Sequence, residues 1–117
     1  MKLSEIVDAL DAKVLVGDHK LDKEINTCGA SDLMSDILAG LSEGCILLTG
    51  LTTVQVIRTA MVAGVGAVVF VRGKKPDQST MELAESYQLP TMVTRYSLFV
   101  ASGKLYMSGL RGLDGSW

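Results

Sequence analysis

Apolar and polar residues follow two different periods along this chain. Between residues 3 and 10 the apolar side chains recur every three or four positions, a spacing that predicts a short amphipathic helix. Two short β-prone segments follow, at residues 13–16 and 24–28, and each is bounded by polar or glycine-rich sequence. The first part of the chain is therefore predicted to form one helix and two strands.

Strands and helices are predicted to alternate in the remainder. Three apolar runs, residues 45–48, 67–71 and 91–94, are too short for helices and typical of strands buried on both faces of a parallel sheet. Helices are predicted at about residues 53–63, 77–87 and 96–108, with Gly64 ending the first of them. This alternation predicts right-handed βαβ crossovers and a three-layer α/β sandwich with a mainly parallel sheet.

A further helix is predicted after Ser31, whose side chain is expected to cap it, with Asp32 in its first turn. Helical spacing assigns it five apolar residues, Leu33, Met34, Ile37, Leu38 and Leu41. In the later helices the residues expected to face inward are Val54, Ile57, Met61, Met81, Leu83, Ala84, Leu98, Ala101 and Leu105.

Length and composition fit one globular domain. The chain has 117 residues, of which 48% are hydrophobic, and at this size a folded chain supports a core without disulfides or metals. We expect a single α/β domain over residues 1–110 and a flexible C-terminal tail over residues 111–117, where glycine and polar residues gather.

The charge balance and the two cysteines limit which partners and which cellular compartment we expect. Eleven basic against 13 acidic residues give a net charge of −2, so no global positive field gathers nucleic acid or anionic lipid. No signal peptide and no apolar run of about 20 residues is found, and the two cysteines suit buried thiols in a reducing compartment. We therefore expect a cytoplasmic protein without nucleic-acid or membrane partners.

The loops that follow the predicted parallel strands meet at the carboxyl edge of the sheet, where α/β proteins bind ligands. These loops combine hydroxyls, glycines, helix N-termini and cations, the groups that hold a phosphate. The alternative is that the hydroxyls cap helices and the basic residues form a solvated turn. The candidate ligand-binding residues are Ser31, Thr49, Gly50, Thr52, Thr53, Arg72, Gly73, Lys74, Lys75, Thr94 and Arg95.

Signals for catalysis are absent from the sequence. No P-loop and no Gly-x-Gly-x-x-Gly follows a strand, and the single histidine, His19, lies in a polar turn without a neighbouring nucleophile. Asp32 and Asp36 stand four residues apart and could share a cation, but a first-turn carboxylate and an exposed neighbour explain them more simply. We expect no catalytic residue, no metal and no cofactor.

Four segments, residues 29–38, 48–60, 69–77 and 94–99, resemble the DRTGG domain, in particular its stand-alone members. That family is similar to the N-terminal domains of HPr kinase and Mur ligases, and it occurs within CBS-domain pyrophosphatases and in the middle of phosphotransacetylases. The resemblance implies an α/β regulatory or dimerising module, usually without catalytic activity. An HPr-kinase label does not fit, because the P-loop is missing.

The chain departs from the motif that names the family. Leu51-Thr52 stands where other members carry Asp-Arg, and Val71-Arg72-Gly73 stands where they carry Thr-Gly-Gly. We expect a non-catalytic regulatory homodimer that binds a partner protein, such as a kinase, a phosphotransacetylase or another metabolic enzyme, and a phosphorylated or nucleotide ligand at the carboxyl edge. The alternatives are a purely structural assembly protein and, less favoured, a small enzyme.

Overall fold

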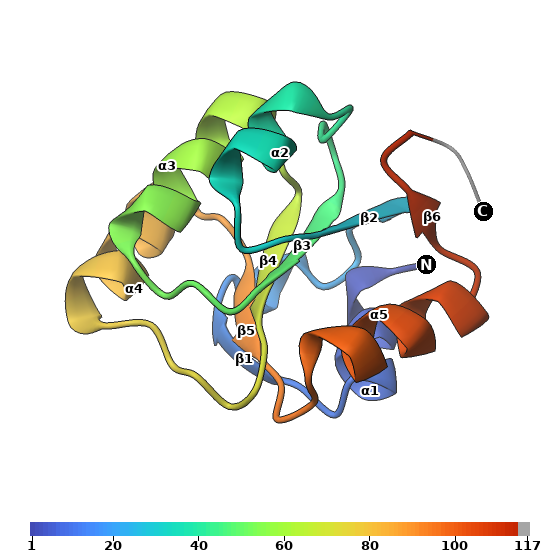
Figure 1. Ribbon diagram of the computed structural model, residues 1–117. Helices are drawn as coiled ribbons and strands as arrows, with labels where there is room; N and C mark the ends of the chain where they lie inside the picture. Colours follow the sequence, from blue (N-terminus) through green and yellow to red (C-terminus); the bar gives the residue numbers. More distant parts are fainter. Residues whose placement is uncertain (115–117) are drawn as a thin grey trace.

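The computed structural model describes residues 1–114, which form a six-stranded sheet with helices on both faces (Figure 1). The strand order is β1-β5-β4-β3-β2-β6, with β1 antiparallel to β5 and every other neighbouring pair parallel. The strands are β1 (Lys13–Val16), β2 (Thr27–Ala30), β3 (Ile46–Thr49), β4 (Ala67–Phe70), β5 (Thr91–Val93) and β6 (Arg111–Gly112).

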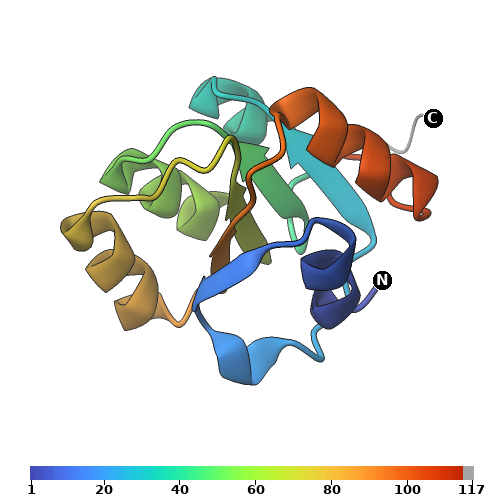
Figure 2. The same ribbon diagram turned by 90° about the horizontal axis from the view of Figure 1, so that it is seen from below.

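Two helical layers cover the sheet (Figure 2). One layer contains α2 (Met34–Ala39), α3 (Val54–Ala63) and α4 (Gln78–Tyr87), and the other contains α1 (Leu3–Ala9) and α5 (Leu98–Met107). A 3-10 turn, η1 (Asp18–Lys20), follows β1. The predicted three-layer α/β fold with a mainly parallel sheet is confirmed. Within residues 1–114 no helix has the length and apolar character that crossing a membrane requires.

The central strands are apolar along their whole length because both of their faces are buried. Every residue of β3 and β4 is buried. Leu47 packs into the apolar cluster under α2, α3 and α4, while its neighbours Ile46 and Leu48 pack into the cluster under α1 and α5. Successive side chains thus enter opposite cores, which explains the absence of polar alternation in the sequence.

Predicted helix ends agree closely with the structure. Gly64 ends α3 with a φ of 73°, a left-handed conformation that glycine adopts at low cost. The side chains of Asp77 and Ser97 cap α4 and α5, accepting hydrogen bonds from the backbone N–H groups of Thr80 at 2.8 Å and Val100 at 3.1 Å.

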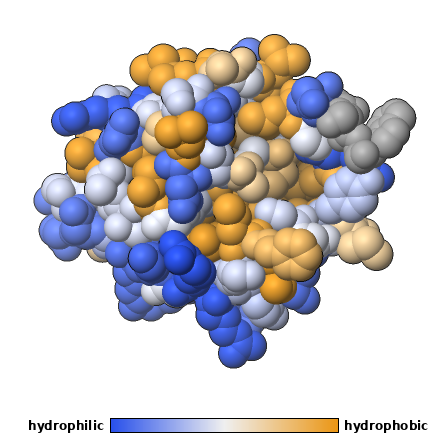
Figure 3. Space-filling model, viewed as in Figure 1, coloured by the Kyte–Doolittle hydropathy of each residue, from blue (hydrophilic) through white to orange (hydrophobic). Residues whose placement is uncertain are grey.

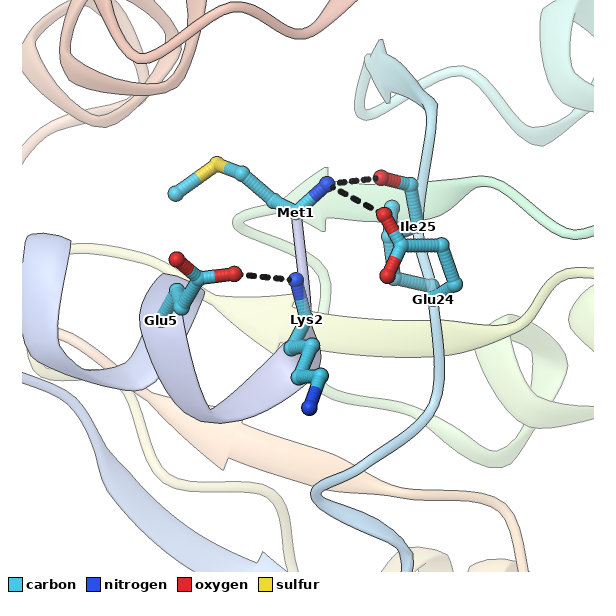
Figure 4. Close-up of polar contacts among 5 residues, drawn as sticks. All are labelled: Met1, Lys2, Glu5, Glu24 and Ile25. Carbon is cyan, nitrogen blue, oxygen red and sulfur yellow. Dashed lines mark hydrogen bonds and ion pairs between the residues drawn. The ribbon is translucent and has the colours of Figure 1, made fainter.

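The strand predicted at residues 24–28 is wrong in position, because β2 runs from Thr27 to Ala30. Glu24 and Ile25 instead pair with the start of the chain (Figure 4). The amino group of Met1 donates to the Glu24 carboxylate and to the Ile25 carbonyl, both at 2.9 Å. In the same region the Glu5 carboxylate accepts from the Lys2 N–H at 2.7 Å, at the first turn of α1.

The helix predicted after Ser31 is shorter and starts later than expected. The Ser31 hydroxyl accepts from the Leu33 N–H at 2.9 Å and makes a local turn, so Leu33 becomes the residue before α2. Of the five apolar residues assigned to this helix, Leu33, Leu38 and Leu41 are 60%, 52% and 78% exposed, whereas Met34 and Ile37 are buried. On α3 the expected inward residue Met61 is also exposed, and Val56 and Ala60 are buried in its place.

Part of the expected C-terminal tail is paired with the sheet. Arg111 and Gly112 form β6 beside β2, and Leu113 packs against the core. The expectation of flexibility from residue 111 rested on local composition and did not include this pairing. Residues 115–117, also assigned to the tail, lie outside the described residues.

Both cysteines are free thiols. Cys45 is buried and Cys28 is partly buried. Burial raises the pKa of Cys28 to about 12, with a smaller contribution from Cys45, and raises the pKa of Cys45 to about 11. Both thiols are therefore protonated and poorly nucleophilic near neutral pH.

Thr91 and Thr94 are both buried, but their side-chain hydroxyls differ in hydrogen bonding. The Thr94 hydroxyl donates to the Leu10 carbonyl at 2.7 Å and accepts from the Tyr96 N–H at 3.3 Å. The Thr91 hydroxyl oxygen is buried without a hydrogen-bond partner among the described residues. One hydroxyl therefore stabilises the fold, and the other carries a desolvation cost without compensation.

Thr94→Val should lower the free energy of unfolding by about 1–3 kcal/mol, because it leaves a buried carbonyl unpaired. Thr91→Val, the matched control, should leave that free energy unchanged or raise it by up to about 1 kcal/mol. Urea denaturation of the two variants measures the difference. Equal losses would contradict the hydrogen-bond assignment at Thr94.

Candidate functional site

The carboxyl ends of the four parallel strands β2, β3, β4 and β5 lie at one edge of the sheet. Their ladders keep them level, since Ala30 pairs with Leu48, Thr49 with Phe70, and Phe70 in turn with Val93. The loops that follow these strands are therefore neighbours, as the parallel arrangement predicts.

Asp32 ties the loop after β2 to the loop after β3. Its Oδ1 accepts a hydrogen bond from the Gly50 N–H at 2.6 Å and another from the Thr49 hydroxyl at 3.1 Å. The Thr49 hydroxyl also accepts from the Leu51 N–H at 3.2 Å. A carboxylate of the chain itself thus occupies the Gly50 amide that an incoming anion would otherwise use.

The guanidinium of Arg72 lies on the same side of Gly50 as this carboxylate. A Cβ placed on Gly50 would stand 2.6 Å from Arg72 Nη2 and 3.3 Å from Asp32 Oδ2. The two charged groups are therefore within about 6 Å of each other, a range in which opposite charges interact. Glycine at this position therefore lets both charged groups lie close to the backbone, and a side chain here would displace the exposed end of Arg72 and press on the Asp32 carboxylate.

The backbone of Arg72 is held in an uncommon conformation by the loop after β5. Arg72 has a φ of 60° and Gly73 a φ of 66°, both left-handed. The Arg72 N–H donates to the Tyr96 carbonyl and the Gly73 N–H to the Thr94 carbonyl, each at 2.8 Å. These two bonds fix the turn that directs the arginine toward Gly50.

Arg72, Lys74 and Lys75 are exposed and form a run of cations at this edge. Within residues 1–114 their side chains make no ion pair and no hydrogen bond. Two carboxylates lie in the same group of loops, Asp32 and Asp77, so the loops after β2, β3 and β4 carry three positive and two negative charges.

Asp77 is committed to the start of α4. Hydrogen bonds from Thr80, and a weaker contribution from the Ser79 hydroxyl, hold the pKa of its carboxyl below the ordinary value. Asp77 is therefore ionised at neutral pH and serves as a helix cap beside the lysines.

Other candidate residues are used elsewhere or stand apart. The Thr94 hydroxyl is buried against Leu10, as described above. The Arg95 guanidinium turns toward α1, where it lies 3.7 Å from the Asp11 carboxylate. The Thr52 carbonyl accepts from the Thr80 hydroxyl at 3.1 Å, and the exposed Thr53 precedes α3 without a side-chain cap bond.

The structure therefore brings together Thr49, Gly50 and Arg72 from the candidate set, with Ser31 in the adjoining turn and Lys74 and Lys75 beside them. It adds Asp32, which sequence reasoning assigned to the first turn of a helix. The available signal was its position directly after a strand, where an acidic side chain can bond the neighbouring loop. We call Asp32, Thr49, Gly50 and Arg72 the Gly50 cluster.

Asp32 and Asp36, the pair that could share a cation, have no third metal-ligating side chain grouped with them among residues 1–114. Among the described residues no three histidine, cysteine, aspartate or glutamate side chains are grouped closely enough to hold a metal ion. His19 is exposed in η1, after the edge strand β1, and so belongs to a different part of the surface.

Comparison with known proteins gives relatives for both the sequence and the fold. The uncharacterized protein YtoI of Bacillus subtilis (strain 168) is 30% identical over 104 residues, which cover 87% of this chain and 23% of that protein. A solved structure of the CBS and DRTGG domains from the regulatory region of Clostridium perfringens pyrophosphatase, complexed with the activator diadenosine tetraphosphate, has a TM-score of 0.76. It is 19% identical, and the match covers 93% of this chain and 47% of that one.

This chain thus spans less than half the length of either relative. Residues 5–107 match the family described as the DRTGG domain, a range that includes the Gly50 cluster and most elements of the fold. The resemblance noted in the sequence is confirmed, and the chain belongs to the DRTGG domain family.

Proposed function

We propose that this chain is a non-catalytic regulatory module that binds a phosphorylated ligand, specifically a nucleotide, at the carboxyl edge of its sheet and acts through contact with another protein chain. The observation that carries the proposal is a set of three cations that form no ion pair within residues 1–114, Arg72 of the Gly50 cluster and the adjoining Lys74 and Lys75. Arginine offers a planar fork of donors to phosphate oxygens, and the lysines add point charges.

The Gly50 cluster favours a nucleotide over a small inorganic anion. Because Asp32 already occupies the Gly50 amide, a phosphate must be held by side-chain cations rather than by loop N–H groups. The same carboxylate repels a compact anion but accepts hydrogen bonds from a ribose hydroxyl or a base amino group. A nucleotide supplies both a phosphate for Arg72 and donors for Asp32.

The state of the two cysteines and the position of the histidine support a binding role rather than catalysis. The pKa values of Cys28 and Cys45 are raised to about 12 and about 11, so neither thiol is an activated nucleophile. His19 is exposed and lies on η1, apart from the Gly50 cluster.

The choice of nucleotides to test follows from the pyrophosphatase regulatory region, whose structure holds the activator diadenosine tetraphosphate. Adenine nucleotides and dinucleoside polyphosphates are therefore the first ligands to compare with this chain. The protein contact we propose is a homodimer or a metabolic enzyme such as a kinase or a phosphotransacetylase.

A second candidate function is assembly without a small ligand. It is favoured by the exposure of large apolar side chains on α5, where Phe99 is 86% and Met107 is 85% exposed. A ligand screen separates the two candidates.

A thermal-shift screen at low salt should identify a ligand among AMP, ADP, ATP, diadenosine tetraphosphate, cyclic dinucleotides, acetyl phosphate and inorganic phosphate. At 100 times its dissociation constant a ligand adds about 2.7 kcal/mol, which raises the Tm of a domain this size by roughly 10 °C. A shift with a nucleotide and none with inorganic phosphate is expected. The absence of any shift would favour the assembly function.

Substitutions at the Gly50 cluster should separate the roles proposed for Arg72 and Asp32. Arg72→Ala removes a charge-assisted contact worth about 1.5–3 kcal/mol, so the dissociation constant should rise roughly 10- to 150-fold. Asp32→Asn keeps an oxygen for the Gly50 N–H but removes the carboxylate that accepts from the nucleotide and repels a compact anion. Nucleotide affinity should therefore fall by a few fold, while affinity for inorganic phosphate rises.

Arg95→Ala is the matched control, because this arginine lies on the neighbouring loop but faces Asp11. When the binding of the nucleotide is measured by isothermal titration calorimetry for each variant, Arg95→Ala should change the dissociation constant less than about twofold. Equal losses with Arg72→Ala and Arg95→Ala would show that a diffuse positive charge, and not the Gly50 cluster, binds the nucleotide.

A further inference from the structure

Helix α5 presents an apolar outer face that no other part of the described chain covers. Phe99 and Met107 are 86% and 85% exposed, and Val100 and Tyr106 are 40% and 45% exposed. The opposite face, with Ala101 and Leu105, is buried against the sheet. Lys104 is the one charged residue of this ten-residue helix, whereas a helix facing water usually carries several. Figure 3 shows this apolar surface around α5, and a second one over α2 and α3.

Gly103 lies at the centre of this outer face. A Cβ at this position would meet nothing within 4 Å, so the fold of one chain gives no reason for glycine here. Glycine also weakens a helix interior relative to alanine. A glycine on an exposed helix face is explained when a second backbone approaches it closely.

The exposed residues of α5 are arranged symmetrically about Gly103. Phe99 lies four positions before it and Met107 four positions after it, while Val100 and Tyr106 lie three positions before and after. When two copies of the helix cross antiparallel at Gly103, Phe99 of one copy faces Met107 of the other, and Val100 faces Tyr106. This pairing is the self-complementarity that a two-fold interface requires.

We propose that the outer face of α5 is the homodimer interface, with the two copies crossing antiparallel at Gly103. This inference rests on the proposed function and assigns the surface through which the module contacts its partner, a second copy of this chain.

Two hollows beside α5 provide space for the partner's side chains. One, of about 410 Å³, lies between α5 and the strands β2 and β6, and the other, of about 620 Å³, lies between α5 and α1. Phe99, Gly103 and Met107 line both of them. The first hollow extends past Met107 to Leu110, where the antiparallel crossing places the partner's Phe99.

The area available matches what a stable dimer needs. At about 200 Å² for a fully exposed large side chain, the four residues Phe99, Val100, Tyr106 and Met107 present roughly 500 Å² per protomer. Two copies bury roughly 1,000 Å² through these residues alone, which reaches the lower bound for a specific interface before the rim is counted.

The cations near this face are held by rings of their own chain. Lys104 Nζ lies 4.9 Å from the centre of the Tyr96 ring, and the Arg111 guanidinium lies 4.5 Å from the centre of the Tyr106 ring. The first contact draws Lys104 toward Tyr96, whereas the second holds the Arg111 charge beside Tyr106, at the edge of the proposed interface that borders the first hollow.

Sedimentation equilibrium of the wild-type chain between about 100 µM and about 1 µM should show twice the mass of one chain. Phe99→Glu places a carboxylate in the apolar interface and should raise the dissociation constant of the dimer at least 100-fold. Val62→Glu on α3, at a residue that is 80% exposed on the opposite helical layer, is the matched control and should leave the dimer intact.

The antiparallel register is tested by a charge exchange. In the double variant Phe99→Glu/Met107→Lys the introduced carboxylate of each protomer faces the introduced ammonium of the other, so at least a tenfold recovery over Phe99→Glu is expected. Phe99→Glu/Met107→Glu should show no recovery. Equal behaviour of the two double variants would overturn the antiparallel crossing.

Gly103→Ala separates folding from association. Its side chain enters open space in one chain and improves the helix, so the Tm measured at a concentration where the protein is monomeric should rise or stay unchanged. The dimer should weaken at least tenfold, because the two backbones can no longer approach. A dimer unaffected by both Gly103→Ala and Phe99→Glu, or one lost in Val62→Glu, would overturn this interface while leaving dimerisation in place. A wild-type monomer at about 100 µM would overturn the dimer itself.

Discussion

Burial of β3 and β4 on both faces is the constraint on which the rest of the structure depends. All eight residues of these strands are buried, so their backbone groups must be satisfied within the sheet and two helical layers are needed to cover them. Parallel neighbours then require crossover helices, and every strand-to-helix loop emerges at one edge. The Gly50 cluster exists because this topology brings the ends of β2, β3 and β4 to the same level.

The sequence predicted those parts of the fold in which local pattern and tertiary environment agree. Continuous apolar runs located the central strands, and Gly64 located the end of α3, because a glycine cap acts within a few residues. The position of β2 was missed because Ile25, as apolar as a strand residue, pairs with Met1 instead. β6 was missed because two residues beside β2 leave no periodic pattern.

The sequence predicted where the candidate site lies but not how its side chains are arranged. Topology alone identified the loops, and Gly50 and Arg72 lie together as expected of residues that follow neighbouring strands. The sequence could not tell which hydroxyl groups are free for a ligand. Those of Thr49 and Thr94 donate to other groups of the chain, the Asp32 carboxylate and the Leu10 carbonyl. Asp32 was assigned to a helix that starts two residues later, and its bond to Gly50 joins segments 18 positions apart.

The proposed ligand site and the proposed interface are joined by a short covalent and hydrogen-bonded path. The backbone of Arg72 is bonded to Tyr96, and Tyr96 directly precedes the cap residue Ser97, from which α5 begins. This path connects α5 with the turn that directs Arg72 toward Gly50. If a nucleotide binds the dimer more tightly than the monomer, linkage requires that it strengthen dimerisation by the same factor per site. In that case the contact between the loops after β4 and β5 is the part of the fold through which nucleotide binding and a change of assembly would be linked.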